Sequence, residues 1–200
     1  LLIQIFVGTI SLNIFISAVQ LRQQGVQQQT QRLPLYLWVV LFAEFAFQGI
    51  HQTLDLVNIL LNSVHIVAVL LVTRFASLSM GIAHNARPFI VFYVLSCLCT
   101  LAFSYAGLGF QVVAFPVALA GAVPLFHIFF TAISSGRWKS LTFAQKFYLA
   151  ISILMGFHYL DYPFLRPYPS TTIFGASLQY AIVHTYSILI PMLVTENAYR

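Results

Sequence analysis

The sequence FQVVAFPVALAGAVPLFHIFFTAIS occupies residues 110–134 and contains no Asp, Glu, Lys or Arg. Its single ionisable side chain is the imidazole of His127. The hydrocarbon core of a bilayer needs about 20 consecutive apolar residues per helix, because no water is present there to satisfy the backbone polar groups. Residues 110–134 therefore predict a transmembrane helix.

Stretches of the same apolar character lie on both sides, separated by polar residues or by Pro and Gly. The connecting segments are too short for a second domain, and no long internal repeat is visible. We expect an all-α, polytopic membrane protein: a single seven-transmembrane helix bundle over residues 1–200. The other six expected spans are residues 2–21, 35–57, 58–82, 88–106, 143–162 and 172–194.

The composition agrees with a bilayer as the solvent. Hydrophobic residues make up 60% of the chain, charged residues make up 6% and the mean hydropathy is +0.89, whereas soluble domains contain about 25% charged residues. The net charge is +5, but the nine Lys and Arg residues are spread over the chain with no basic run, so we exclude nucleic acid as a partner. The expected partner is the lipid bilayer.

Basic residues are distributed unevenly among the predicted connectors. With a cytoplasmic C-terminus, only Arg166 falls on the outer side, and Arg74 lies inside a span. The cytoplasmic side then carries Arg22, Arg32, Arg87, Arg137, Lys139, Lys146 and Arg200. Cytoplasmic loops of membrane proteins are enriched in Lys and Arg. The sequence therefore predicts an N-terminus outside and a C-terminus in the cytoplasm.

Two charged residues inside spans need an explanation, because an ionisable side chain in a bilayer is costly unless it is paired or hydrated. Counting along the second and third spans places Glu44 and Arg74 at the same depth on antiparallel neighbours. We expect an ion pair between them. It has either a structural role or the role of a switch whose opening moves the third span.

Polar residues also gather near the outer ends of three spans. His51 and His65 lie at about the same depth, on either side of the turn between the second and third spans. Asp55 follows His51 at helical spacing, so the two share a helix face, and Asp161 follows His158 in the same way. The expected outer polar tier comprises His51, Asp55, Asn62, His65, His158 and Asp161.

A second set of polar residues lies deeper. His127 and His184 both fall in the inner half of their spans, and His84 lies at the cytoplasmic mouth. Ser177, Tyr180, His184 and Ser187 recur at helical spacing and predict a polar stripe on the last span that faces the bundle interior.

Three chemistries fit these histidines. Two imidazoles from different helices can clamp a b-type haem, imidazole with carboxylate can hold a divalent metal, and both groups can hydrogen-bond a polar ligand. The candidate metal or haem ligands are His51, His65, His127, His158 and His184. Isolated histidines satisfied by backbone groups are the alternative. No catalytic motif occurs in the sequence, so no catalytic residue is predicted.

Residues 156–167 read GFHYLDYPFLRP. This segment resembles the membrane-embedded N-terminal sensor regions of bacterial sensor histidine kinases and diguanylate cyclases, in which an H-x-x-D-Y-P-x-x-R-P-like segment precedes the last span. His158, Asp161, Pro163, Arg166 and Pro167 carry the resemblance. We expect residues 158–167 to form a rigid outer cap, in which Arg166 pairs with Asp161 or Asp55.

The resemblance implies a signal-sensing input domain in the bacterial inner membrane, working as a homodimer. It also implies a cytoplasmic kinase or cyclase output domain after residue 200, where any enzymatic activity would reside. The signal is expected to be a small molecule bound between helices by His51, Asp55, Asn62, His65, His158, Asp161, Arg166, Tyr180 and His184. The rival functions are a haem-based redox sensor or electron carrier, and a small transporter or channel.

Overall fold

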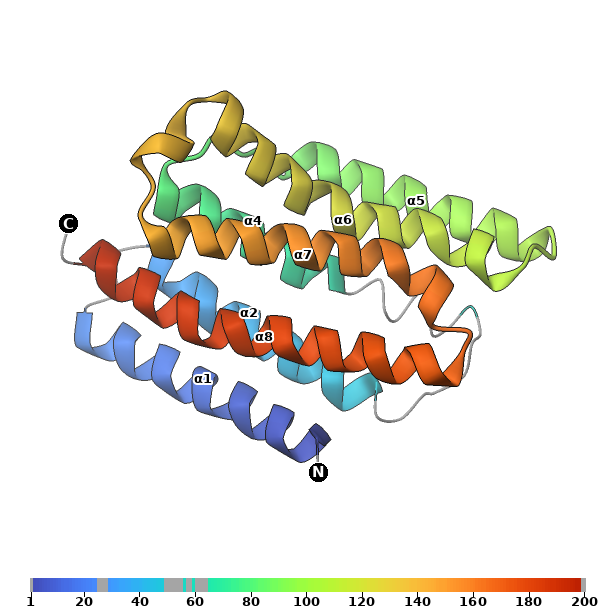
Figure 1. Ribbon diagram of the computed structural model, residues 1–200, viewed down its shortest axis with the longest axis horizontal. Coiled ribbons are helices and arrows are strands. Elements are labelled where there is room, and N and C mark those ends of the chain that lie inside the picture. Colours follow the sequence, from blue (N-terminus) through green and yellow to red (C-terminus); the bar gives the residue numbers. More distant parts are fainter. Residues whose placement is uncertain (1, 25–28, 49–55, 57–58, 60–64, 199–200) are drawn as a thin grey trace.

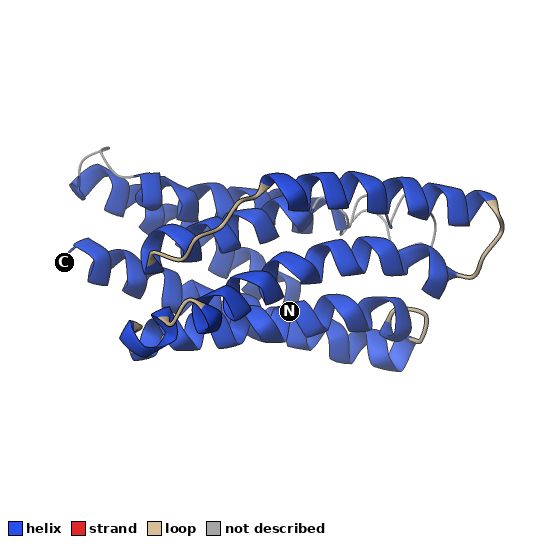
Figure 2. Ribbon diagram, turned by 90° about the horizontal axis from the view of Figure 1, so that it is seen from above, coloured by secondary structure: helices blue, strands red, loops and turns tan. Residues whose placement is uncertain are grey.

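The computed structural model describes residues 2–24, 29–48, 56, 59 and 65–198. No strand occurs among these residues (Figure 2), which confirms the all-α prediction for them. They form the α-helices α1 (Leu2–Gln24), α2 (Gln29–Gln48), α4 (His65–Met80), α5 (Arg87–Tyr105), α6 (Phe110–Ser134), α7 (Phe143–Leu165) and α8 (Pro169–Ala198), with a short 3-10 helix, η1 (Arg137–Ser140).

The helices form an elongated bundle in which successive helices run in opposite directions (Figure 1). The turns from α4 to α5 and from α6 to α7 therefore lie at the same end as the C-terminus. Helix α6 packs against α5 and α7, α8 packs against α7 and α1, and α2 joins α1 to α4. The core lies between these helices, and its largest fully buried side chains include Trp38, Phe75, Leu125, Tyr148 and Leu193.

The end of α7 differs from the sequence prediction. Pro163 was expected to begin a connector that continued to Thr171, but α7 runs through it to Leu165, and α8 begins at Pro169. A proline this close to a helix end removes one intrahelical hydrogen bond and leaves the last turn in place, and proline is favoured in a first turn because it lacks an N–H. Most of the expected rigid cap is therefore helical.

Small residues bring α6 and α7 close together. A Cβ atom added at Gly156 would lie 2.9 Å from the Phe126 ring, and one added at Gly121 would lie 3.1 Å from the Tyr159 ring. Glycine at these positions lets an aromatic ring of the other helix pack directly on the backbone, as is common between membrane helices. This contact fixes Tyr159 within the candidate site below.

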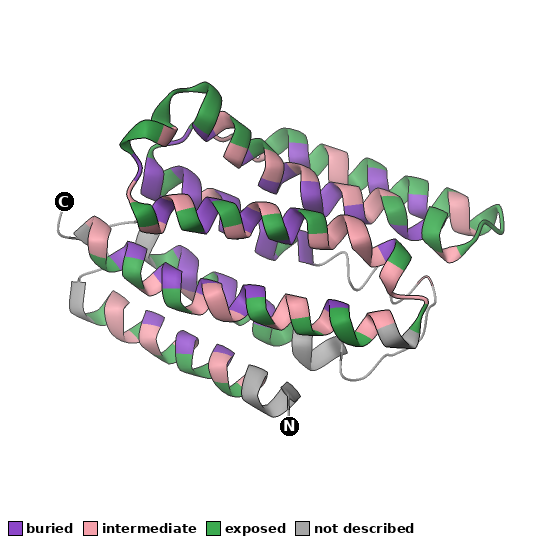
Figure 3. Ribbon diagram, viewed as in Figure 1, coloured by how far each residue is buried: buried purple, intermediate pink, exposed green. Residues whose placement is uncertain are grey.

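The outer surface of the bundle is apolar. On α5, the side chains of Ile90, Val91, Val94, Leu95 and Leu98 are exposed (Figure 3). Three helical segments of the described chain are long and apolar enough to cross a membrane: Arg87–Tyr105, Phe110–Ser134 and Thr171–Asn197. Shorter apolar helical segments are Val7–Arg22, Arg32–Ala43 and His65–Met80. Length and composition therefore support three spans among the described residues, and the expected total of seven spans stays a prediction.

Candidate ligand-binding site

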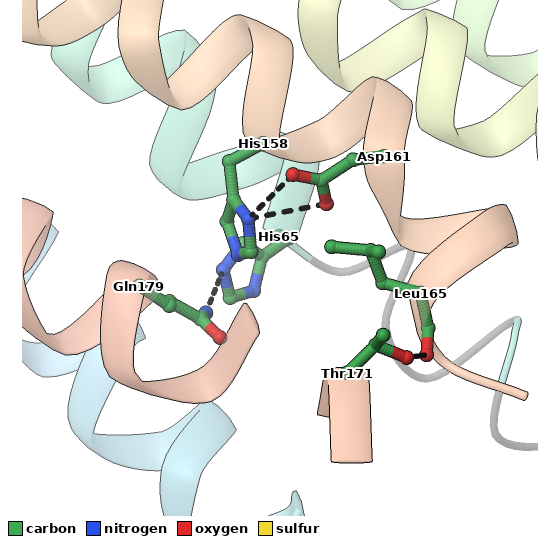
Figure 4. Close-up of polar contacts among 6 residues, drawn as sticks. All are labelled: His65, His158, Asp161, Leu165, Thr171 and Gln179. Atoms are coloured by element: carbon green, nitrogen blue, oxygen red, sulfur yellow. Dashed lines mark hydrogen bonds and ion pairs between the residues drawn. The ribbon is translucent and has the colours of Figure 1, made fainter. Parts of the chain in front are cut away.

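Polar side chains from three helices meet near the end of the bundle that lies away from the C-terminus (Figures 1 and 4). His65 is the first residue of α4, His158 and Asp161 lie in the last turns of α7, and Gln179 lies in the first half of α8. The predicted convergence of His65, His158 and Asp161 is seen in the structure. We call these four residues together with Tyr159 the outer cluster.

His158 and Asp161 form a pair on one face of α7. The Nδ1 atom of His158 lies 3.2 Å from Oδ1 and 3.4 Å from Oδ2 of Asp161. A carboxylate at this position accepts a hydrogen bond from the Nδ1–H group and so fixes the orientation of the imidazole. Figure 4 shows the other edge of the His158 ring directed toward His65. The pair therefore presents a ring nitrogen to the space between α4, α7 and α8.

His65 links α4 to α8. Its side chain is buried, and its Nε2 atom lies 3.1 Å from Nε2 of Gln179. The amide nitrogen of Gln179 is a donor, so the His65 Nε2 atom accepts this hydrogen bond and the imidazole is neutral. His158 lies close enough to act on His65 electrostatically. His65 is thus paired with Gln179 of α8, while His158 is paired with Asp161 of its own helix.

Tyr159 forms the wall of the outer cluster. Its ring packs edge-on against His65, with 5.5 Å between the centroids, and its face covers Gly121 of α6. In the part of the chain that the structure describes, the buried Tyr159 hydroxyl has no hydrogen-bond partner. A buried hydroxyl without a partner costs about 1–3 kcal/mol. A polar ligand or a water that reached this hydroxyl would recover that energy.

A second polar network lies toward the C-terminal end and ties α7 to α4. The Gln145 side chain donates from Nε2 to the Ser79 carbonyl at 3.2 Å, and the Tyr148 hydroxyl donates to the Val72 carbonyl at 3.0 Å. Both donors are fully or almost fully buried. Buried hydrogen bonds between helices are fixed in place because no water can replace them.

The same network ties α7 to α8. The Tyr186 hydroxyl donates to Ser152 Oγ at 2.9 Å, and Ser152 donates to the Tyr148 carbonyl at 2.9 Å. Near the ends of both helices, Thr142 Oγ1 lies 3.2 Å from Glu196 Oε2. The helix α8 is therefore held by side-chain hydrogen bonds in its first half, near its middle and near its end.

Several predicted site residues lie away from the outer cluster or outside the residues that the structure describes. His51, Asp55 and Asn62 lie outside the residues that the structure describes. So does the side chain of Glu44, and the expected pair with Arg74 stays a prediction. Arg166 caps α7 through its backbone. Asp161 is paired with His158 on the same helix, and Asp55, the other expected partner of Arg166, lies outside the described residues, so the pairing of Arg166 stays a prediction.

The predicted polar stripe on α8 does not define its interior face. Ser177 is exposed, and its hydroxyl bonds to the Ile173 carbonyl of its own helix. Tyr180 and His184 are half-buried. The buried face instead passes through Ile182, Val183, Tyr186, Leu189, Ile190 and Leu193. The sequence analysis missed Gln179 and Tyr186, although a Gln inside an apolar segment is itself an unusual signal.

The predicted haem and metal ligands are divided between two places. His65 and His158 lie in the outer cluster, whereas His127 contacts the ring of His84, with 5.8 Å between the centroids. Among the described residues, no group of three or more His, Cys, Asp or Glu side chains is placed to hold a metal ion. Haem or metal binding remains a prediction.

Comparison with protein-family models, with curated proteins and with solved structures gave no match to this chain.

Proposed function

We propose that this chain is the membrane-embedded input domain of a bacterial signalling protein. It binds a small polar molecule at the outer cluster and transmits the binding event through α8. The observation that carries the proposal is the meeting of His65, His158, Asp161 and Gln179 from three helices at one end of the bundle. Ionisable and polar groups within a membrane bundle are costly unless they are paired or hydrated, and they commonly mark ligand sites.

The proposed topology has seven spans, with the N-terminus outside and the C-terminus in the cytoplasm of a bacterial inner membrane. The apolar outer surface and the alternating helix directions support this topology. The bundle end that carries the C-terminus also carries Arg87, Arg137, Lys139 and Lys146. A concentration of basic residues on one side is typical of the cytoplasmic side. The outer cluster then faces the periplasm.

The hydrogen bonds of α8 support transmission through this helix. Gln179 connects α8 to the outer cluster, and Tyr186 and Glu196 connect it to α7 nearer the cytoplasmic end. A ligand that competes for His65 or His158 would change the first of these contacts and bias the position of α8. The proposed homodimer rests on the family resemblance alone.

The first test is to read the coding sequence beyond residue 200. We expect a kinase or cyclase output domain joined to α8 by a continuous helix. A reading frame that ends shortly after residue 200 would overturn the proposed function.

The second test measures the output activity of that full-length protein in membranes. Gln179→Leu removes the donor to His65, and we expect it to change the basal or stimulated output by about fivefold or more. The matched control is Gln111→Leu, because Gln111 is exposed at the start of α6. Equal output from both variants contradicts signalling through the outer cluster. An intense Soret band that is lost in His65→Phe would instead support the haem alternative.

A further inference from the structure

A second group of polar side chains lies at the C-terminal end of the bundle, where the loop between α4 and α5 turns back. Gly81 has a φ of +63°, a left-handed conformation that favours glycine. The turn is closed by the Ile82 N–H, which donates to the Ser77 carbonyl at 3.1 Å, and by the Ser77 hydroxyl, which donates to the Ile82 carbonyl at 2.8 Å. This rigid turn holds His84 against the neighbouring helices.

His84 is held by ring contacts. Its imidazole stacks on Phe89 of α5, with 5.3 Å between the centroids and 9° between the planes. His127 of α6 approaches both rings, with its centroid 5.8 Å from His84 and 5.0 Å from Phe89. Arg74 of α4 lies close enough to act on His84 electrostatically. Three basic side chains from three parts of the chain therefore share one small region.

The ring nitrogens of His84 are enclosed by the protein. Both Nδ1 and Nε2 are buried, and in the described part of the chain neither has a hydrogen-bond partner. A neutral imidazole carries one donor and one acceptor, and leaving both unsatisfied is unfavourable. Burial, together with His127 and Arg74, lowers the pKa of His84 to about 4. A bound group that accepts hydrogen bonds and carries negative charge would relieve both effects.

The chemistry of the neighbours selects an anion over a metal ion. A metal would be bound by two imidazoles at most and would be repelled by the Arg74 guanidinium, because a cation next to a cation is unfavourable. A phosphate group offers several acceptor oxygens and negative charge, which match guanidinium and imidazole donors.

The surroundings favour a lipid as the source of that phosphate. His127 is exposed on the same helix as the exposed apolar side chains of Phe130 and Ile133. Arg87 begins α5 a few residues from His84, and the Arg137 guanidinium lies beside Gly81. Basic side chains next to apolar surface at the cytoplasmic end of membrane helices are suited to anionic headgroups.

We propose that Arg74, His84 and His127 form a binding site for the headgroup phosphate of an anionic phospholipid. The site rests on the membrane embedding in the proposed function, but it does not depend on the sensor role. Arg74 supplies the permanent charge, and His84 and His127 donate from their ring nitrogens. The acyl chains then lie along the apolar surface beside His127.

The test uses the full chain, purified in detergent, with phosphatidylglycerol, phosphatidylcholine or inorganic phosphate as the probe. Bound lipid is counted by native mass spectrometry, and the melting temperature is followed in parallel. We expect phosphatidylglycerol to bind about tenfold or more tightly than phosphatidylcholine and to raise the melting temperature. The preference should be lost in Arg74→Gln and in His84→Phe, which keeps the ring stack on Phe89. The charge-matched control, Lys139→Gln, should retain it.

Three results would overturn the proposal. The first is equal binding of the two lipids by the unmodified chain, which needs no variant to fold. The second is an unchanged preference in both Arg74→Gln and His84→Phe. The third is inorganic phosphate that protects as well as phosphatidylglycerol, because it would assign the site to a soluble anion. Recovery of the chain from cells without detergent would instead contradict the membrane embedding itself, whereas a failed output assay leaves this site unaffected.

Discussion

The histidines at the two ends of the bundle differ in their hydrogen-bond partners. In the outer cluster, one ring nitrogen of His65 is paired with Gln179 and one ring nitrogen of His158 is paired with Asp161. At the other end, the nitrogens of His84 have no partner among the described residues, and a guanidinium lies nearby. A histidine that is paired with a side chain is oriented by the protein, whereas a histidine with two unpaired ring nitrogens beside a cation favours an external anion. The predictions below test this contrast.

The largest effect is expected at the packing between α6 and α7, which connects the helix of His127 to the helix of His158. Gly156→Val would force a branched side chain into the Phe126 ring, which lies 2.9 Å from an added Cβ. We expect a loss of about 2–3 kcal/mol in the free energy of unfolding, measured by thermal denaturation in detergent.

The matched control for this packing is Gly8→Val. Gly8 is exposed on α1, and no described atom lies within 4 Å of an added Cβ. We expect this control to be neutral or slightly stabilising, because valine has a higher helix propensity than glycine. Equal melting temperatures for the two variants would show that Phe126 moves aside without cost.

A smaller effect is expected from breaking the link between α4 and α8 in the outer cluster. Gln179→Leu leaves the buried His65 Nε2 atom without its donor, and we expect a loss of about 1–2 kcal/mol. A double-mutant cycle with His65→Leu should give a coupling energy of about 1 kcal/mol. Additive effects of the two substitutions, within about 0.3 kcal/mol, would mean that the hydrogen bond contributes nothing to stability.

The next prediction concerns the pH dependence of stability caused by His84, at the end of the bundle that carries the C-terminus. The pKa of His84 is lowered to about 4 by burial, by His127 and by Arg74, whereas a histidine in an unfolded chain has a pKa near 6.5. The unfolded state therefore binds more protons between these values, so stability is retained above pH 6.5 and falls as the pH decreases toward 4. We expect His84 to account for about 1 kcal/mol of this loss, after allowance for solvent screening.

The measurement compares melting temperatures of the unmodified chain and His84→Phe between pH 4 and pH 7, since all other ionisable groups are present in both. The difference between the two curves isolates His84. Phosphatidylglycerol should flatten this difference, because a bound phosphate favours the charged imidazole. Superimposable pH profiles for the two proteins would be inconsistent with a lowered pKa at His84.

The contrast also indicates what could be predicted from sequence. The depth of a residue along the bundle could be predicted, because each helical residue advances about 1.5 Å. Counting residues alone placed His65 and His158 at the same end. The face of the helix on which a residue lies could not be predicted, because an error of one residue rotates that face by about 100°. The stripe through Ser177 was therefore placed on the interior face, while the buried Tyr186 and the partner residue Gln179 were missed.

Contacts made by loop residues could not be predicted either, because counting residues along a span does not locate a loop. His127 was placed in the inner half of its span, as was His184, but counting did not indicate that its aromatic neighbours are His84 and Phe89. The fold of the loop depends on the left-handed Gly81 and on the Ser77 hydroxyl. Neither determines the position of His84 until the neighbouring helices are known, so a site formed by a loop requires the structure.

The smallest effect is expected from Arg166, for which the sequence predicted a pair with Asp161 or Asp55. Because Asp161 is paired with His158, Arg166→Gln should change the free energy of unfolding by less than about 0.5 kcal/mol. Asp161→Asn should cost more, since it removes the carboxylate that orients the half-buried imidazole. Thermal denaturation of both variants and of their combination distinguishes the two pairings. If Arg166→Gln costs as much as Asp161→Asn and the double variant costs no more than either, Arg166 is the partner of Asp161. His158 would then lack the carboxylate pairing that distinguishes it from His84.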